Sequence, residues 1–124
     1  MTTPEGRLVV RAQGDVAVVE LTGDIDAGAE GALATAWDDA VDLHPSAVAL
    51  SFEHVGYINS TGIALVVGML SKAQAWQIPL RAYGLSDHYR EIFTITRLAD
   101  YLEIHEDEAS AVGADDAHRE GSTT

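Results

Sequence analysis

Hydrophobic residues change their spacing several times along this chain of 124 residues, and each change marks a different kind of element. Residues 8–12 and 16–22 are short runs rich in β-branched side chains, separated by a Gln-Gly-Asp turn, and they predict a β-hairpin. We expect residues 23–26 to end the second strand. From Ala29 onward one apolar face recurs at helical spacing, so a helix is predicted before Pro45.

The same alternation of strands and helices continues toward the C-terminus. Residues 47–52 and 78–83 have the length and apolar character of buried strands, and residues 101–105 alternate like a last strand. Helices are predicted after Asn59, from about residue 87 to 96, and over residues 106–112. The order ββαβαβαβα implies parallel strands joined by right-handed crossovers after the first hairpin. We therefore predict an α/β fold, with helices packed on a mixed β-sheet.

One segment combines a helix start with hydroxyl groups. Asn59, Ser60 and Thr61 are all residue types that favour the N-cap position of a helix. Residues 63–70, which follow them, are apolar nearly all round, so most sides of this helix are expected to be covered. On the residues alone, these three polar residues are a helix cap.

Charge and composition exclude several classes of function. The chain has 20 Asp and Glu residues against 7 Lys and Arg residues, which gives a formal net charge of −13. Such a surface repels nucleic acid and anionic membranes, so a basic protein surface is the expected partner. The chain has no cysteine, which excludes a disulfide scaffold and a Cys-ligated zinc site. Its 5 histidines have no ligand spacing, and neither a metal nor a cofactor is expected.

Catalysis is also not expected. Ser60, His54 and Asp26 could be imagined as a hydrolase triad, but Gly56 and Gly62 have the wrong spacing around Ser60 for a nucleophile elbow. The glycines at positions 23, 28 and 31 do not form a phosphate-binding loop, and the only lysine is Lys72.

The length of the chain predicts one domain with two short flanking segments. Residues 1–7 are expected to be an N-terminal lead, and residues 113–124 an acidic flexible tail or, alternatively, an interaction tail. The first residues lack the pattern of a signal peptide, and residues 63–70 are too few to span a membrane. We therefore expect a cytoplasmic protein that does not insert into membranes.

Several segments, in order, resemble the STAS domain, the fold of bacterial anti-sigma factor antagonists. Residues 57–62, Tyr-Ile-Asn-Ser-Thr-Gly, are similar to the loop that carries the phosphorylated serine of that family. The resemblance covers about residues 8–112, so that range is the expected STAS domain. Further matching segments are residues 21–26, 48–52, 80–86 and 97–104.

The resemblance implies a function based on reversible protein binding. In that family the free antagonist binds an anti-sigma factor, which is a serine kinase of the histidine-kinase-like ATPase fold, and a sigma factor is released. The kinase then phosphorylates the loop serine, and a phosphatase removes the phosphate. By resemblance the phosphorylated residue is Ser60, and Ile58 and the Ser60 hydroxyl are expected to be buried against the partner. The expected partner-binding residues are Asp24, Asp26, Ile58, Asn59, Ser60, Thr61 and Gly62.

Two positions depart from the family pattern. The family usually has Asp before the serine, where this chain has Asn59, and often Asp in the third strand, where this chain has Ser51. Both changes remove negative charge near the loop. They favour an alternative, a STAS subunit that does not switch and belongs to a lipid-transport or stress-signalling assembly. A STAS domain that binds a small ligand or a nucleotide is a further alternative.

Overall fold

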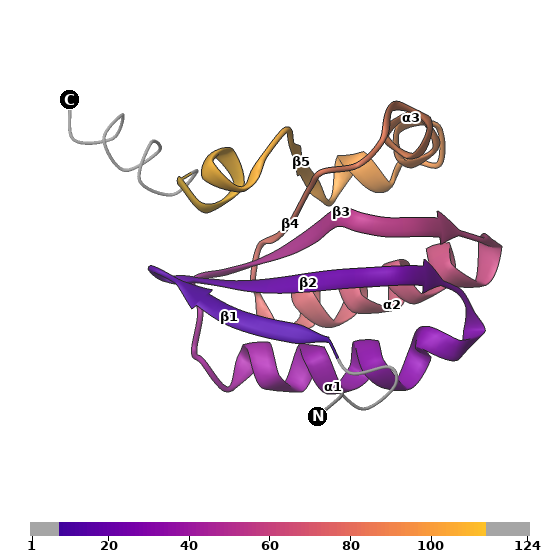
Figure 1. Ribbon diagram of the computed structural model, residues 1–124. Coiled ribbons are helices and arrows are strands. Elements are labelled where there is room, and N and C mark those ends of the chain that lie inside the picture. The colour runs from indigo at the N-terminus through magenta and orange to yellow at the C-terminus, as the bar shows by residue number, and fades with distance from the viewer. Residues whose placement is uncertain (1–7, 114–124) are drawn as a thin grey trace.

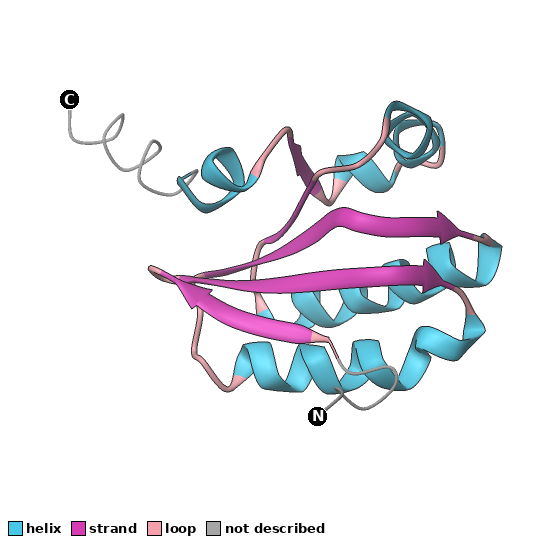
Figure 2. Cartoon of the chain, in the orientation of Figure 1, coloured by secondary structure: helices cyan, strands magenta, loops and turns pink. Residues whose placement is uncertain are grey.

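A single sheet organises the chain, and the two strands of the predicted hairpin form one edge of it (Figure 1). The structure, a computed structural model, describes residues 8–113. The order of the strands is β1-β2-β3-β4-β5, in which β1 runs antiparallel to β2 and the other neighbours are parallel. This arrangement confirms the predicted mixed sheet and the predicted order of its elements (Figure 2).

The elements follow one another with short connections. The strands are β1 (Val9–Gln13), β2 (Val16–Ile25), β3 (Ala47–Ile58), β4 (Leu80–Tyr83) and β5 (Glu103–His105). The helices are the 3-10 turn η1 (Ala27–Ala29), α1 (Glu30–Val41), α2 (Ser60–Trp76), α3 (Asp87–Ile95) and the 3-10 turn η2 (Leu98–Asp100), and residues 108–113 are also helical.

Two strands are longer than the sequence predicted. The expectation that residues 23–26 end the second strand is wrong, because β2 continues to Ile25 and β3 continues past Phe52 to Ile58. The two extensions pair with each other through two register shifts, and Gly23 adopts φ +76 between them. A glycine allows such an irregularity without breaking the ladder. Both strands therefore extend beyond β4, whose pairing with β3 ends at Ser51.

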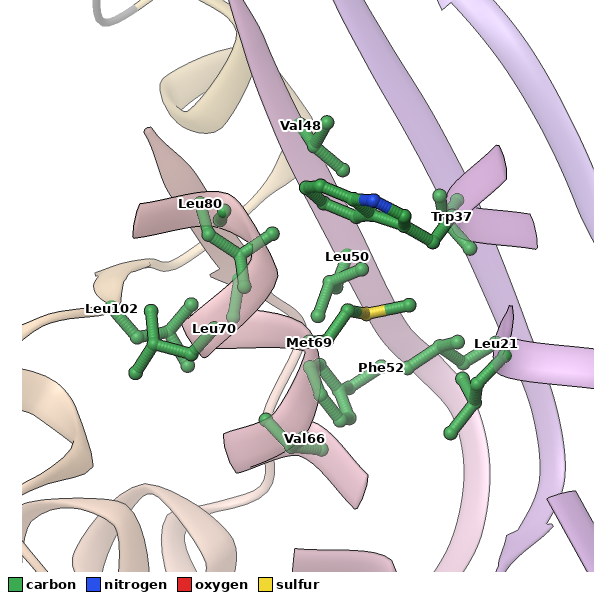
Figure 3. Close-up of a cluster of buried hydrophobic side chains, with 14 of the residues drawn as sticks. Leu21, Trp37, Val48, Leu50, Phe52, Val66, Met69, Leu70, Leu80 and Leu102 are labelled. Atoms are coloured by element: carbon green, nitrogen blue, oxygen red, sulfur yellow. The ribbon is translucent and has the colours of Figure 1, made fainter. Parts of the chain in front are cut away.

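One face of the sheet packs against α1 and α2, and the main core lies between them (Figures 1 and 3). The core includes Trp37 of α1 and Met69 of α2, which lie over Leu21 and Leu50 of the sheet. The expectation that α2 is covered on most sides is wrong, because its outer side is open. Ala64, Val67 and Gly68 are exposed there, and the side chain of Trp76 at the end of the helix is 61% exposed.

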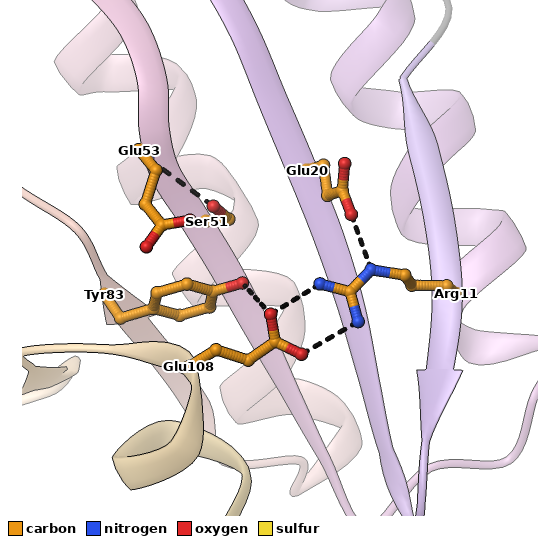
Figure 4. Close-up of polar contacts among 6 residues, drawn as sticks. All are labelled: Arg11, Glu20, Ser51, Glu53, Tyr83 and Glu108. Carbon is orange, nitrogen blue, oxygen red and sulfur yellow. Dashed lines mark hydrogen bonds and ion pairs between the residues drawn. The ribbon is translucent and has the colours of Figure 1, made fainter.

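The helical segment 108–113 lies against the other face of the sheet and is held there by a polar cluster (Figure 4). Arg11 of β1 donates hydrogen bonds to both carboxylate oxygens of Glu108, at 2.8 and 2.6 Å, and also pairs with Glu20. The Tyr83 hydroxyl donates to Glu108 at 3.1 Å, while Ala111 is buried beside it. Hydrogen bonds from Arg11 lower the pKa of Glu108, and burial raises the pKa of Tyr83.

Replacement of Glu108 tests the contribution of this cluster to stability. The pKa of Glu108 is lower in the folded protein than its ordinary value of 4.5, so its stabilising contribution is present above that value and disappears as the pH falls through the folded pKa. We expect Glu108→Gln to lower the free energy of unfolding at neutral pH by about 1 kcal/mol. The difference from the wild type should shrink in acid. Urea unfolding of the wild type and the variant, at neutral pH and at acidic pH, measures this difference in stability. Glu106→Gln replaces an exposed acid outside the cluster and is the control. An equal effect of the two substitutions would contradict the assignment.

Candidate functional site

The predicted site residues come together where β2 and β3 end side by side. The backbone N–H of Asn59 donates to the carbonyl oxygen of Ile25 at 3.3 Å, which joins the beginning of the α2 loop to the end of β2. Asp24 is exposed next to the β3 strand, and its carboxylate lies close to the backbone of Gly56. The parallel pairing of the two strands therefore brings together segments more than thirty residues apart in sequence.

Asn59 caps α2, and this leaves the Ser60 hydroxyl free of that role. The side-chain oxygen of Asn59 accepts a hydrogen bond from the Gly62 N–H at 2.8 Å. The backbone carbonyl oxygen of Asn59 accepts one from the Ile63 N–H at 2.9 Å. Ser60 is the first residue of the helix, and both Ser60 and Thr61 are exposed. The structure thus assigns the cap to the first of the three candidate residues and presents the two hydroxyls at the surface.

Two residues expected to contact a partner are instead part of the interior. Ile58 is only 4% exposed and belongs to the main core, so the expectation that its side chain is buried against a partner is wrong. Gly62 is also buried. The cause is the register of β2 and β3, which places Ile58 opposite Ile25 and turns its side chain into the core. The exposed apolar side chain of this segment is the preceding residue, Tyr57, at 56%.

Asp26 has a local structural role in addition to its place near the loop. Its side chain accepts a hydrogen bond from the Gly28 N–H at 2.9 Å and caps η1. This is the N-cap role that its position between a strand and a helix favours. Its carboxylate is therefore held in position, one residue beyond the β2 strand end that contacts the α2 loop.

Tyr89 of α3 is a contact of the site that the sequence analysis missed. Its hydroxyl accepts a hydrogen bond from the backbone N–H of Ile58 at 2.9 Å. Helical spacing places Tyr89 on the inner face of α3, but that pattern does not identify a partner 31 residues away in the sequence.

The surface of α2 that follows Ser60 has little charge. Lys72 is the one charged residue between Ser60 and Trp76, whereas α1 and α3 both carry carboxylates. Val67, on the outer side of α2, is 40% exposed, and Ala64 and Gly68 beside it are exposed as well. A shallow groove of about 200 Å³ runs between α1 and α2 and reaches Ala64, one turn after Ser60. The exposed serine therefore lies at one end of an apolar, acid-free helix face.

Gly62 permits the close approach of α2 to the end of β2. A Cβ atom at this position would lie 1.8 Å from the carbonyl oxygen of Ile25 and 3.0 Å from the Ile58 side chain. Because the nearest obstacle is backbone, a side chain could be accommodated only if the helix or the strand moved.

Alanine substitutions at two glycines of α2 test this contact. We expect Gly62→Ala to lower the free energy of unfolding by about 3 kcal/mol or more, since the new methyl group overlaps backbone. Gly68→Ala in the same helix meets no atom within 4 Å, and it should raise stability by about 0.5–1 kcal/mol through helix propensity. Chemical denaturation of the two variants measures both effects. Similar stabilities would show that the approach of α2 to β2 is not close.

Substitution of Asn59 tests the cap. Asn59→Ala removes the acceptor of the Gly62 N–H and should cost about 1 kcal/mol of stability, whereas Asn59→Asp keeps an acceptor and should cost little. Thermal unfolding of the two variants measures the difference. If both lost the same stability, the side-chain oxygen would not be the stabilising group.

None of the helices in the described part of the chain is both long and apolar enough to cross a membrane. Similar proteins are known, and two similarities in sequence cover part of each chain. An anti-sigma-B factor antagonist of Listeria monocytogenes is 36% identical over 55 residues, which are 44% of this chain and 48% of that protein. One of Staphylococcus aureus is 35% identical over 57 residues, which are 46% of this chain and 53% of that protein. The aligned segment thus spans about half the length of these curated relatives.

Solved structures share the fold over nearly the whole chain at low sequence identity. The unphosphorylated anti-sigma factor antagonist SpoIIAA superposes with a TM-score of 0.66 and 18% identity, over 90% of this chain and 97% of that one. An anti-sigma factor antagonist from Mycobacterium paratuberculosis superposes with a TM-score of 0.73 and 19% identity, over 92% and 97%. The STAS domain family matches residues 7–111, which is most of the sequence, and this chain therefore belongs to that family.

Proposed function

We propose that this chain is an anti-sigma factor antagonist whose binding to an anti-sigma factor is controlled by phosphorylation of Ser60. The observation that supports this most directly is the exposed Ser60 side chain at the first position of α2, beside a cap that Asn59 provides. The chain then acts in the cytoplasm by binding rather than by catalysis. Its partner is a serine kinase of the histidine-kinase-like ATPase fold, and a phosphatase restores the unmodified form.

The loop is suited to carry a phosphate without unfolding. The cap of α2 depends on the Asn59 side chain and not on the Ser60 hydroxyl, so modification of the hydroxyl leaves the cap bonds in place. Asn59 is also uncharged, so the phosphate meets no carboxylate on the residue before it. The positive end of the α2 dipole favours the added charge of about −1.5 to −2. The phosphorylated protein is therefore expected to keep its fold.

The switch then acts through the surface that the partner touches. Ser60 and Thr61 lead onto the apolar face of α2 at Ala64 and Val67. A partner that covers this face must exclude water from it, and a dianion at its edge would lose its hydration against the apolar patch of the partner. A cost of about 4 kcal/mol would weaken binding by about a thousandfold. No large conformational change is required.

The charges around this face suggest what the partner presents. Asp24 and Asp26 lie beside the loop, and α1 begins with the exposed Glu30. The contact surface therefore has an apolar centre along α2 with acidic groups on one side. A partner with an apolar patch flanked by Lys or Arg residues would be complementary to it, and the net charge of −13 would speed their encounter.

Variants of Ser60 test the switch. Incubation of the chain with ATP and its anti-sigma factor kinase should add one phosphate at Ser60, detected by mass spectrometry, and Ser60→Ala should abolish it. Titration calorimetry with the same partner should show wild-type affinity for Ser60→Ala and an affinity lower by about a hundredfold or more for Ser60→Asp, which carries less charge than phosphate. Ser110→Asp adds the same charge at an exposed position of the helical segment 108–113, which lies on the other face of the sheet, and is the matched control.

Tight binding of Ser60→Asp together with an unmodified wild-type chain would refute the switch. That result would favour the second candidate function, a STAS subunit that does not switch and belongs to a lipid-transport or stress-signalling assembly. Asn59 and Ser51 favour this candidate, since both stand where the family often has an acid. Ser51 is buried in β3, where its hydroxyl accepts a hydrogen bond from the Glu53 N–H at 3.5 Å (Figure 4).

A further inference from the structure

The second half of β3 lacks a strand neighbour on one side among the described residues. β4 pairs with β3 only from Val48 to Ser51, whereas β3 continues to Ile58. In a parallel ladder, successive residues direct their N–H groups to opposite sides. The Asn59 N–H is directed to β2, where it bonds to Ile25, so the Ile58 N–H is directed away from β2, to the side where β4 has already ended.

The Tyr89 hydroxyl supplies the acceptor that a longer β4 would have offered. Its oxygen lies 2.9 Å from the Ile58 nitrogen. Tyr89 is in turn held by its own helix, because the backbone N–H of Tyr89 donates to the capping Ser86 side chain at 3.3 Å. One turn later, Phe93 is fully buried and meets the ring of Phe52 edge to face, with the ring centres 5.9 Å apart. α3 thus contacts β3 through both an apolar and a polar interaction.

The polar contact is at the residue that leads directly into the cap of α2. Ile58 precedes Asn59, whose side chain and backbone hold the first turn of α2. A cavity of about 190 Å³ lies between the end of β3 and α3, lined in part by Gly56, Leu85 and Tyr89. The Ile58 side chain is held by the main core, and on the side of this cavity the hydrogen bond from the Ile58 amide to Tyr89 restrains the backbone.

We infer that Tyr89 is a positioning residue for Ser60, an inference that rests on the proposed phosphorylation of that serine. By holding the Ile58 amide, Tyr89 fixes the backbone that carries Asn59 and therefore the direction in which the Ser60 hydroxyl is presented. Loss of the Tyr89 hydroxyl leaves the fold intact. It allows the loop to depart from the geometry that a kinase needs for in-line attack of the Ser60 hydroxyl on the phosphate of ATP. Tyr89 itself touches neither the hydroxyl nor the kinase in this role.

Tyr89→Phe tests this inference, because it removes the hydroxyl and keeps the ring. Tyr101→Phe, at a side chain that is 64% exposed, is the matched control. In the first measurement, amide hydrogen exchange is followed by NMR. The Ile58 amide of the wild type should be protected although it has no strand partner on that side, and in Tyr89→Phe its exchange should become about three- to tenfold faster, the equivalent of one ordinary hydrogen bond. Tyr101→Phe should leave it unchanged.

In the second measurement, phosphorylation is followed with the anti-sigma factor kinase that modifies the wild type. Tyr89→Phe should lower kcat by a similar factor of about three to ten while KM changes little, because the partner surface is intact and only the alignment of the acceptor is lost. A residue that merely stabilises the fold would leave both constants unchanged at temperatures well below unfolding.

Each result decides a separate point. An Ile58 amide that exchanges equally fast in the wild type and in Tyr89→Phe would overturn the inference, and so would faster exchange with an unchanged kcat. If the wild type accepts no phosphate at Ser60, the proposed function fails instead, and the exchange measurement still shows whether Tyr89 holds the loop.

Discussion

The contact between the first turn of α2 and the end of β2 determines the form of this site. Gly62 lies so close to the Ile25 carbonyl oxygen that no side chain fits between them, and the Asn59 N–H bonds to the same oxygen. With the helix start held against the strand end, Asn59 can cap α2 while Ser60 is directed outward. The separation of the capping role from the exposed hydroxyl depends on this contact.

The two faces of the sheet are stabilised by different kinds of interaction. On one face, burial of apolar side chains such as Trp37 and Met69 joins α1 and α2 to the strands, and burial of this kind is the main favourable contribution to folding. On the other face, a smaller apolar patch is covered by residues 108–113, and the ion pair between Arg11 and Glu108 holds that segment in place. The site is built on the first face, so its geometry is expected to be insensitive to loss of the second contact.

Control by phosphorylation in this fold requires a change in surface charge and no rearrangement of the core. The proposed partner face has two parts, the acid-free side of α2 and the acidic strand ends at Asp24 and Asp26. A phosphate on Ser60 would add negative charge where the two parts meet. In the same proposal Tyr89 acts from the opposite side of the loop, through the backbone, and connects the presentation of the hydroxyl to α3.

The local pattern of the sequence was sufficient for the order of the elements and the cap at the start of α2, because spacing and capping preferences are properties of neighbouring residues. The family followed from the resemblance of several segments in order. The lengths of β2 and β3 were not predictable, since their extensions are stabilised by pairing with each other and override the glycines and acids that indicated a turn. The same pairing buried Ile58, which the sequence analysis had assigned to the partner surface. Tyr89 and Glu108 acquired their contacts only in the folded chain, because hydrogen bonds between residues far apart in sequence leave no periodic signal.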